Sequence, residues 1–241
     1  MLTWLVVTGA ASAADTTLVW DLSVKGANVG SRELTVRTMN GADGQSRVLE
    51  SFTDINGMVG PLKVRWRQRM TAHVDAREPA AFTSVVDQNG SLLEIQGRWT
   101  PNAWQITSTT NGRSRATEMP LSRIDLSTAD LMDPSSRMPL SHYEEVRVLS
   151  AESGEVLVGP VEKLGVSEVT IDGQAIQVTG YAWTSPQGRS EFMFSADGWL
   201  VRYSTQLLGV EVEALLRDPP PGGSDDFPVA VRPPKVEVQD L

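Results

Sequence analysis

The stretch at residues 62–74, LKVRWRQRMTAHV, decides the fold because its side chains alternate between two chemical classes. One class is basic or polar, and the other is apolar except for Gln68, its one polar break. Residues two apart share a face in a β-strand, whereas a helix repeats every 3.6 residues or so. The stretch therefore predicts a strand that is buried on one side. The apolar set consists of Leu62, Val64, Trp66, Met70, Ala72 and Val74.

Turn residues separate similar β-favouring runs along the rest of the chain. Asn-Gly and Asp-Gly pairs tolerate the positive φ angles of tight hairpins, so they predict chain reversals. Such turns are expected at 26–28, 40–44, 56–57, 89–90, 111–112, 172–173 and 197–198. In the second half, strands are expected at 166–171, 174–183, 190–195, 199–207 and 210–216. The short spacing predicts an all-β fold: a single curved antiparallel sheet, in a half-barrel-like meander.

A short connector at about 120–140 interrupts the strand pattern. Residues 127–132 are typical of one helical turn begun by a hydroxyl cap, while a plain crossover loop is the alternative. If the helical turn forms, its apolar neighbours would cover an open end of the sheet. These neighbours are Leu126, Leu131, Met132 and Met138.

The two ends of the sequence differ in composition from the body. Residues 1–14, MLTWLVVTGAASAA, are apolar and then small, which predicts a signal peptide cleaved near Ala13 or Ala14, although no basic residue precedes Lys25. A buried N-terminal strand or helix is the alternative. The Pro-rich tail at 218–241 is expected to be disordered. The expected location is therefore periplasmic or secreted, with an antiparallel β domain at 15–217.

The overall composition disfavours several classes of function. A net charge of −9 disfavours binding to nucleic acid or to an anionic membrane surface. The absence of cysteine excludes disulfides, thiol catalysis and Cys-ligated metals. His73 and His142 are the only histidines, so one chain cannot build a multi-histidine metal site. No metal or cofactor is expected.

No catalytic motif is recognisable, so the protein is expected not to be an enzyme. A serine hydrolase would need one of the two histidines as its base, and the G-x-S-x-G elbow is absent. Glu144 and Glu145 are adjacent in a predicted strand and point to opposite faces, which makes them a poor glycosidase pair. Three connector carboxylates lack EF-hand spacing and are more typical of turn caps than of calcium ligands. They are Asp125, Asp130 and Asp133.

Four basic side chains share the polar face of the first strand: Lys63, Arg65, Arg67 and Arg69. Like charges repel, so negative groups are expected nearby. Cross-strand pairing with the chain's own acidic residues is one explanation. An anionic ligand or partner that docks on this face is the other.

Tryptophans recur on the predicted strands: Trp66, Trp99, Trp104, Trp183 and Trp199. They are candidates for the lining of an apolar pocket inside the half-barrel. Alternatively, they fill the core of a curved sheet without forming a pocket.

Three stretches carry a family resemblance: WDLSVKGANVGSRELTV at 20–36, GPVEKLGVSEVTIDGQAIQVTGYAW at 159–183, and RSEFMFSADGWLVRYSTQLLGVEVEALLRD at 189–218. They resemble uncharacterised bacterial envelope proteins and the β domain that precedes the catalytic domain of some bacterial transglutaminase-like proteins. The matching residues are Gly26, Gly30, Gly165, Glu168, Asp197, Gly198, Leu200, Val201, Arg202, Leu208 and Gly209.

The resemblance implies a half-barrel like that of bacterial lipoprotein carriers, and it carries over no catalytic residue because a Cys-His-Asp triad needs cysteine. The Pro-rich tail lies where the catalytic domain would begin, which implies a stand-alone version. The expected function is non-enzymatic binding of an apolar or amphipathic ligand, or of a protein partner, in the cell envelope. An interaction module that uses a sheet edge is one alternative, and a hydrolase with an unrecognised site is another.

Overall fold

The computed structural model describes residues 15–41, 44–59, 62–75, 81–136 and 138–221. Within these residues fifteen strands form one sheet: fourteen fall into two meanders, and the short β9 lies in the connector between them. The first meander consists of β1 (Asp15–Val24), β2 (Ala27–Gly41), β3 (Gly44–Val59), β4 (Leu62–Asp75), β5 (Ala81–Gln88), β6 (Ser91–Trp99), β7 (Ala103–Thr110) and β8 (Arg113–Pro120). The second consists of β10 (Glu145–Leu149), β11 (Val156–Ile171), β12 (Gln174–Ser185), β13 (Gly188–Ser195), β14 (Leu200–Leu207) and β15 (Val210–Leu216).

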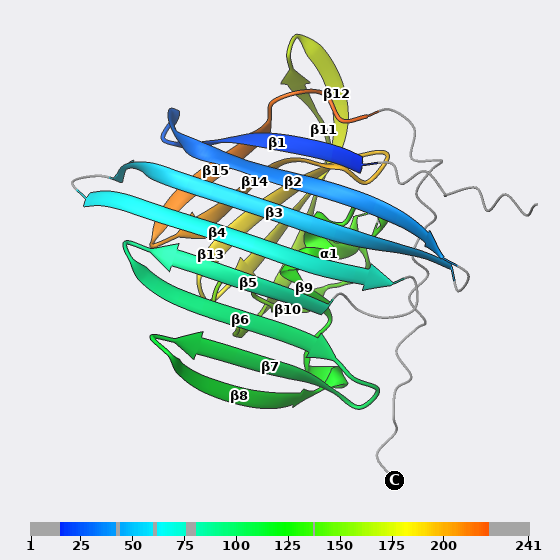
Figure 1. Ribbon diagram of the computed structural model, residues 1–241. Coiled ribbons are helices and arrows are strands. Elements are labelled where there is room, and N and C mark those ends of the chain that lie inside the picture. The colour runs from blue at the N-terminus through cyan, green and yellow to red at the C-terminus, as the bar shows by residue number, and fades with distance from the viewer. Residues whose placement is uncertain (1–14, 42–43, 60–61, 76–80, 137, 222–241) are drawn as a thin grey trace, which may run out of the picture.

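The sheet curls so that the two meanders face each other (Figure 1). Its strand order runs from β8 to β1, then from β15 to β10 and β9 (Leu126–Ser127). The meanders join where β1 pairs antiparallel with β15, from Trp20 opposite Leu216 to Ser23 opposite Glu213. In the described part of the chain the outermost strands, β8 and β9, do not pair, so the sheet stays open. The expected all-β, curved antiparallel fold is confirmed.

Alternation along the strands builds the core, as β4 illustrates. Val64, Trp66 and Met70 are buried on the concave side, whereas Lys63 and Arg65 are exposed on the convex side. The polar break, Gln68, also points inward and is 2% exposed. The inner faces of both meanders contribute to one continuous hydrophobic cluster, which explains why residues two apart carry the same chemistry.

The predicted hairpins form at most of the expected turns. Asn89, Asn111 and Asp172 each adopt a positive φ beside a glycine at a tight turn between two strands. The expected turn at 40–44 lies partly outside the described residues. The expected reversal at Asn56-Gly57 is wrong, because both residues lie within β3 and pair with β4. A Cβ atom on Gly57 would meet Val29 Cγ1 at 3.1 Å, so this glycine permits close packing inside the sheet.

The connector contains the predicted helical turn, α1 (Thr128–Met132), together with the 3-10 turns η1 (Leu121–Arg123), η2 (Pro134–Ser136) and η3 (Pro139–His142). The carboxylate of Asp130 accepts hydrogen bonds from Ser127 N at 2.7 Å and from Ser127 Oγ at 2.9 Å. These bonds occupy groups that a helix start would otherwise leave unpaired. The cap fixes α1 inside the curve of the sheet, where Leu131 and Met132 are buried (Figure 1).

The expected signal peptide at 1–14 and the tail from 222 onward lie outside the described residues. Within the residues that are described, no helix has the length and hydrophobicity needed to cross a membrane.

Candidate functional site

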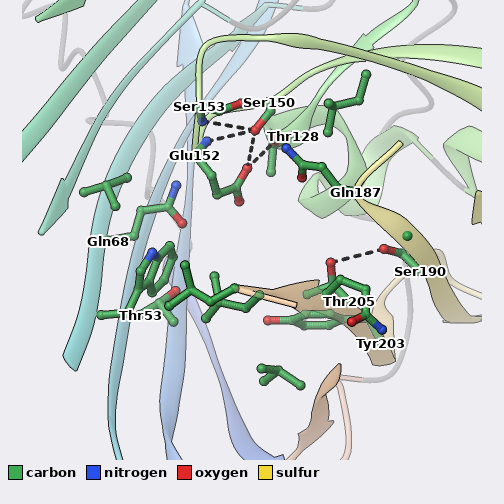
Figure 2. A pocket seen from close by; sticks show the side chains of 18 of the residues that line it. Thr53, Gln68, Thr128, Ser150, Glu152, Ser153, Gln187, Ser190, Tyr203 and Thr205 are labelled. Atoms are coloured by element: carbon green, nitrogen blue, oxygen red, sulfur yellow. Dashed lines mark hydrogen bonds between the residues drawn. The ribbon is translucent and has the colours of Figure 1, made fainter. Parts of the chain in front are cut away.

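A cavity of about 720 Å³ lies inside the curve of the sheet and is lined by both meanders and α1 (Figure 2). Its volume falls within the range of roughly 300–1,000 Å³ that is usual for small-molecule sites. Apolar side chains supply much of its wall, and they come from strands far apart in the sequence. Examples are Leu22, Ile55, Trp66, Leu131, Leu157 and Phe192.

The cavity opens at the tips of several hairpins. The lining residues Gln88, Thr110, Gln187 and Leu208 are exposed, and each lies at or beside a turn between consecutive strands. The lining residues within the strands are mostly buried. A ligand would therefore enter past turn residues and lie among strand residues.

Three polar side chains cross the inner wall in one row. Arg32 on β2 is opposite Thr53 on β3, and Thr53 is opposite Gln68 on β4. All three are buried and line the cavity. On one side of this polar row, the next inward residues include Ile55 and Trp66, which line the cavity. On the opposite side, the next inward residues are Leu34, Ser51 and Met70, and none of these three lines the cavity. The polar row therefore marks the deep end of the cavity at these strands.

Arg32 is a buried cation whose hydrogen-bond partners are neutral. Its Nε donates to Ser51 Oγ at 3.1 Å and its Nη1 donates to Tyr203 Oη at 3.1 Å. Its guanidinium carbon also lies 5.7 Å from the centre of the Tyr203 ring. Burial lowers the pKa of Arg32, but the Tyr203 hydroxyl and the more distant Glu152 raise it, and the net shift is upward. The guanidinium is therefore charged at every physiological pH.

Glu152 brings a negative charge to the same cavity. It lies on the turn that follows β10, where its carboxylate accepts a hydrogen bond from Ser150 Oγ at 2.9 Å (Figure 2). Gln68 Nε2 donates to the carbonyl oxygen of Ala151 at 3.2 Å and to Ser84 Oγ at 3.0 Å. Gln68 thus ties this turn of the second meander to β4 of the first.

Three residues that line the cavity each carry a polar side-chain atom that is almost wholly covered and has no hydrogen-bond partner in the described part of the chain. These atoms are Arg32 Nη2, Thr53 Oγ1 and Trp183 Nε1. A buried polar group that makes no hydrogen bond costs about 1–3 kcal/mol, and more when it is charged. All three groups can donate a hydrogen bond, so an acceptor that reached them after a small side-chain rotation would satisfy them.

The five candidate tryptophans separate into three groups. Trp66 and Trp183 line the large cavity, on β4 and β12. Trp99 lines a second hollow of about 480 Å³, together with His73 and Arg98. Trp104 and Trp199 are buried in the hydrophobic core and line neither space. The five residues are thus divided between two hollows and the packed core.

The basic stripe lies on the convex face, away from the cavity. Arg67 forms a salt bridge of 3.0 Å with Asp54 on β3, and the Arg69 guanidinium lies 5.8 Å from the centre of the Phe52 ring. Lys63 and Arg65 are exposed. Cross-strand pairing with the chain's own acids thus accounts for Arg67, while the four residues do not contribute to the cavity.

The candidate catalytic residues do not come together. His73 is exposed on β4, and His142 is exposed at the end of η3. Glu144 and Glu145 are exposed too. None of these four lines the large cavity.

The connector aspartates have structural partners. Asp125 forms an ion pair with Arg147 at 2.8 Å, Asp130 caps α1, and Asp133 forms an ion pair with Arg47 at 3.3 Å. Among the described residues, no group of three or more acidic, histidine or cysteine side chains could hold a metal ion.

Sequence reasoning missed the polar groups of the cavity: Arg32, Thr53, Glu152 and Tyr203. One available signal was the position of Arg32, which shares its face of β2 with Leu34 and Val36. A charged residue on an apolar face marks either a buried pair or a site, and Gln68 breaks the pattern of β4 in the same way. Glu152 gave no such signal because it lies on a turn.

Comparison with known proteins identifies a structure of similar fold and a matching family. A solved structure from Brucella abortus, described as a β-barrel-like protein of domain of unknown function DUF1849, matches with a TM-score of 0.58 and 8% sequence identity. The match covers 84% of this chain and 95% of that one, and it concerns the fold alone. No curated protein matches the sequence. The model of the domain of unknown function DUF6134 matches residues 20–217, so the chain belongs to the DUF6134 family.

Proposed function

We propose that this protein binds a small amphipathic molecule in its interior cavity and is not an enzyme. The observation that carries the proposal is a cavity of about 720 Å³ whose wall combines apolar side chains with a buried row of polar groups. Such a combination binds a tail through the apolar wall and orients it through the polar groups. A cavity of this kind in the core would otherwise reduce stability, because its lining forgoes packing contacts.

The alternatives have weaker support. A hydrolase needs a nucleophile beside a base, and neither histidine lines the cavity. A module that binds through a sheet edge would use β8, whose residues are mostly exposed. That edge explains nothing about the interior cavity, whereas ligand binding does.

A titration of the protein with a fluorescent probe tests the proposal. The uncharged probe N-phenyl-1-naphthylamine brightens in an apolar cavity, and we expect saturable binding with a stoichiometry of about one. Val86→Trp places a large ring into the cavity from β5 and should abolish the signal. The matched control is Val85→Trp on the same strand, where the side chain is exposed on the convex face. Equal binding by both variants would contradict the proposal, provided that both keep the wild-type circular dichroism.

The expected signal peptide supports a further proposal, that the protein works in the cell envelope or outside the cell. N-terminal sequencing of the protein purified from its native source tests this point. A mature chain that begins near Asp15 is the expected result, and a retained Met1 would contradict export.

A further inference from the structure

We propose that the ligand carries a single negative charge and that its anionic headgroup binds Arg32 and Thr53 at the deep end of the cavity. This inference rests on the proposed function, because it names the chemical class that the same cavity selects. The relevant class is a monoanionic amphiphile, such as a long-chain carboxylate.

The first argument is the charge of Arg32. Arg32 is 8% exposed and its guanidinium donates hydrogen bonds to two hydroxyls. Among the described residues, no carboxylate forms a salt bridge with it. Burying a charge is costly unless an opposite charge or strong hydrogen bonds compensate. A bound anion would supply this compensation, and charge-assisted hydrogen bonds are roughly twice as strong as neutral ones.

The second argument is the match between the atoms without partners and the needs of an anion. Arg32 Nη2 and Thr53 Oγ1 have no partner in the described chain, and their residues are directly opposite each other on β2 and β3. Opposed residues in antiparallel strands have Cβ atoms about 5 Å apart. A carboxylate has two acceptor oxygens, so it can accept one hydrogen bond from each of these groups.

The third argument is the position of this pair relative to the apolar wall. The row lies at the deep end, and the cavity extends from it past Ile55 and Trp66 toward the hairpin tips. A headgroup at Arg32 therefore leaves the tail lying along apolar side chains. The depth also excludes water from the ion pair, which strengthens it.

Glu152 limits the charge that the headgroup can carry. Its carboxylate lines the same cavity and acts electrostatically on Arg32. A second negative charge on the ligand would be repelled by Glu152, whereas a single charge is balanced by Arg32. We therefore expect a carboxylate to bind better than a phosphate monoester of the same tail.

Competition for the neutral probe tests the inference on the full-length protein. The competitors share a twelve-carbon chain, which is roughly the size that such a cavity accepts. They are dodecanoate, dodecan-1-ol, dodecylamine and dodecyl phosphate. We expect dodecanoate to bind at least about tenfold more tightly than the alcohol, as one charged hydrogen bond implies. The amine and the phosphate should both bind more weakly than dodecanoate.

Three variants connect this preference to the named residues. Arg32→Gln should abolish the preference for acid over alcohol, while Arg32→Lys should restore part of it. Thr53→Val should reduce the preference and leave the unliganded fold as stable as wild type, because the hydroxyl has no partner to lose. Because each variant is judged by its own ratio of acid to alcohol affinity, a modest loss of stability does not obscure the result.

The possible outcomes separate the two proposals. Absence of probe binding would overturn both. Probe binding with equal affinities for acid and alcohol would leave ligand binding intact and overturn the anionic site. A preference for the amine would also overturn it, and would point to Glu152 as the dominant charge. An acid preference that survives Arg32→Gln would show that the anion binds elsewhere.

Discussion

Among the described residues two arginines are buried, and their surroundings differ. Arg47 is 3% exposed and forms a salt bridge with Asp133, which is also buried. Arg32 is 8% exposed, and within the described chain its hydrogen bonds go to two hydroxyls. The first arrangement pairs the cation with a buried carboxylate and links β3 to the connector, and it leaves Arg47 Nε without a hydrogen-bond partner among the described residues. The second offers a charge to the cavity, which is why we assign a structural role to Arg47 and a binding role to Arg32.

Removing the partner of Arg47 should strongly destabilise the fold. Asp133→Ala leaves a buried cation without its counter-charge, and we expect a loss of about 3–5 kcal/mol in the free energy of unfolding. The control is Glu50→Ala, which breaks the exposed 3.0 Å ion pair with Arg37 and should cost less than about 1 kcal/mol. Urea denaturation measures both values. Similar losses for the two variants would contradict a structural role for the buried pair.

Among the secondary-structure elements, α1 begins with a capping box formed by Ser127 and Asp130. Asp130 accepts two hydrogen bonds from Ser127, and residues of this helix form part of the cavity wall. Asp130→Ala should cost about 1–2 kcal/mol, as the loss of a helix cap does, and should also weaken probe binding because Leu131 and Met132 shift. Asp130→Asn keeps one acceptor oxygen and should cost less. Urea denaturation and the probe titration together test this, and unchanged probe affinity in the alanine variant would contradict it.

The strand pair β11–β12 contains a second sensitive point. A Cβ atom on Gly159 would lie 1.8 Å from the carbonyl oxygen of Thr184, so the backbones could not remain in place. Gly159→Ala should cost at least about 2 kcal/mol through overpacking. Gly180→Ala is the control, because the closest contact of its Cβ would be with the Leu164 side chain at 3.1 Å, and the nearest backbone atom across the strand pair, Gly165 O, would lie at 3.8 Å. Thermal melts of both variants measure the difference, and equal melting temperatures would refute the steric argument.

Local pattern predicted the elements much better than their pairing. Alternation and turn residues were enough to place β4, the second part of β11, β12 to β15 and the capped turn of α1, since these signals lie within a few neighbouring residues. The junction of β1 with β15 joins Trp20 to Leu216, and no local pattern encodes such a contact. The Asn-Gly pair at 56–57 misled because glycine serves close packing as well as turns. The site was predicted in part: the sequence suggested Trp66 and Trp183, but Arg32 and Thr53 become neighbours only once the register is known.

At the scale of the whole molecule, one hydrophobic cluster spans both meanders. Side-chain hydrogen bonds also join the two meanders across the interior. Trp20 Nε1 donates to Leu200 O at 3.1 Å, and Gln68 Nε2 donates to Ala151 O. The meanders therefore depend on each other and should unfold together.

A ligand bound between the meanders should accordingly stabilise the entire fold. At a free concentration about one hundredfold above its Kd, dodecanoate should add about 2.7 kcal/mol to the free energy of unfolding. Calorimetry should then show a single transition that moves several degrees upward, by roughly 2–4 °C per kcal/mol. Two separate transitions, of which only one moves, would contradict a shared core.

Hairpin tips border the mouth of the cavity. The polar row of Arg32, Thr53 and Gln68 lies instead on strands that each pair with a neighbouring strand on both sides. Loops of this kind tolerate insertion and substitution because few buried contacts depend on them. Different parts of the chain therefore control the entry of the ligand and the binding of its headgroup. Homologous proteins can therefore acquire wider or narrower cavity openings without a change at the buried Arg32. The size of the ligand can then diverge between homologues while its headgroup chemistry stays the same.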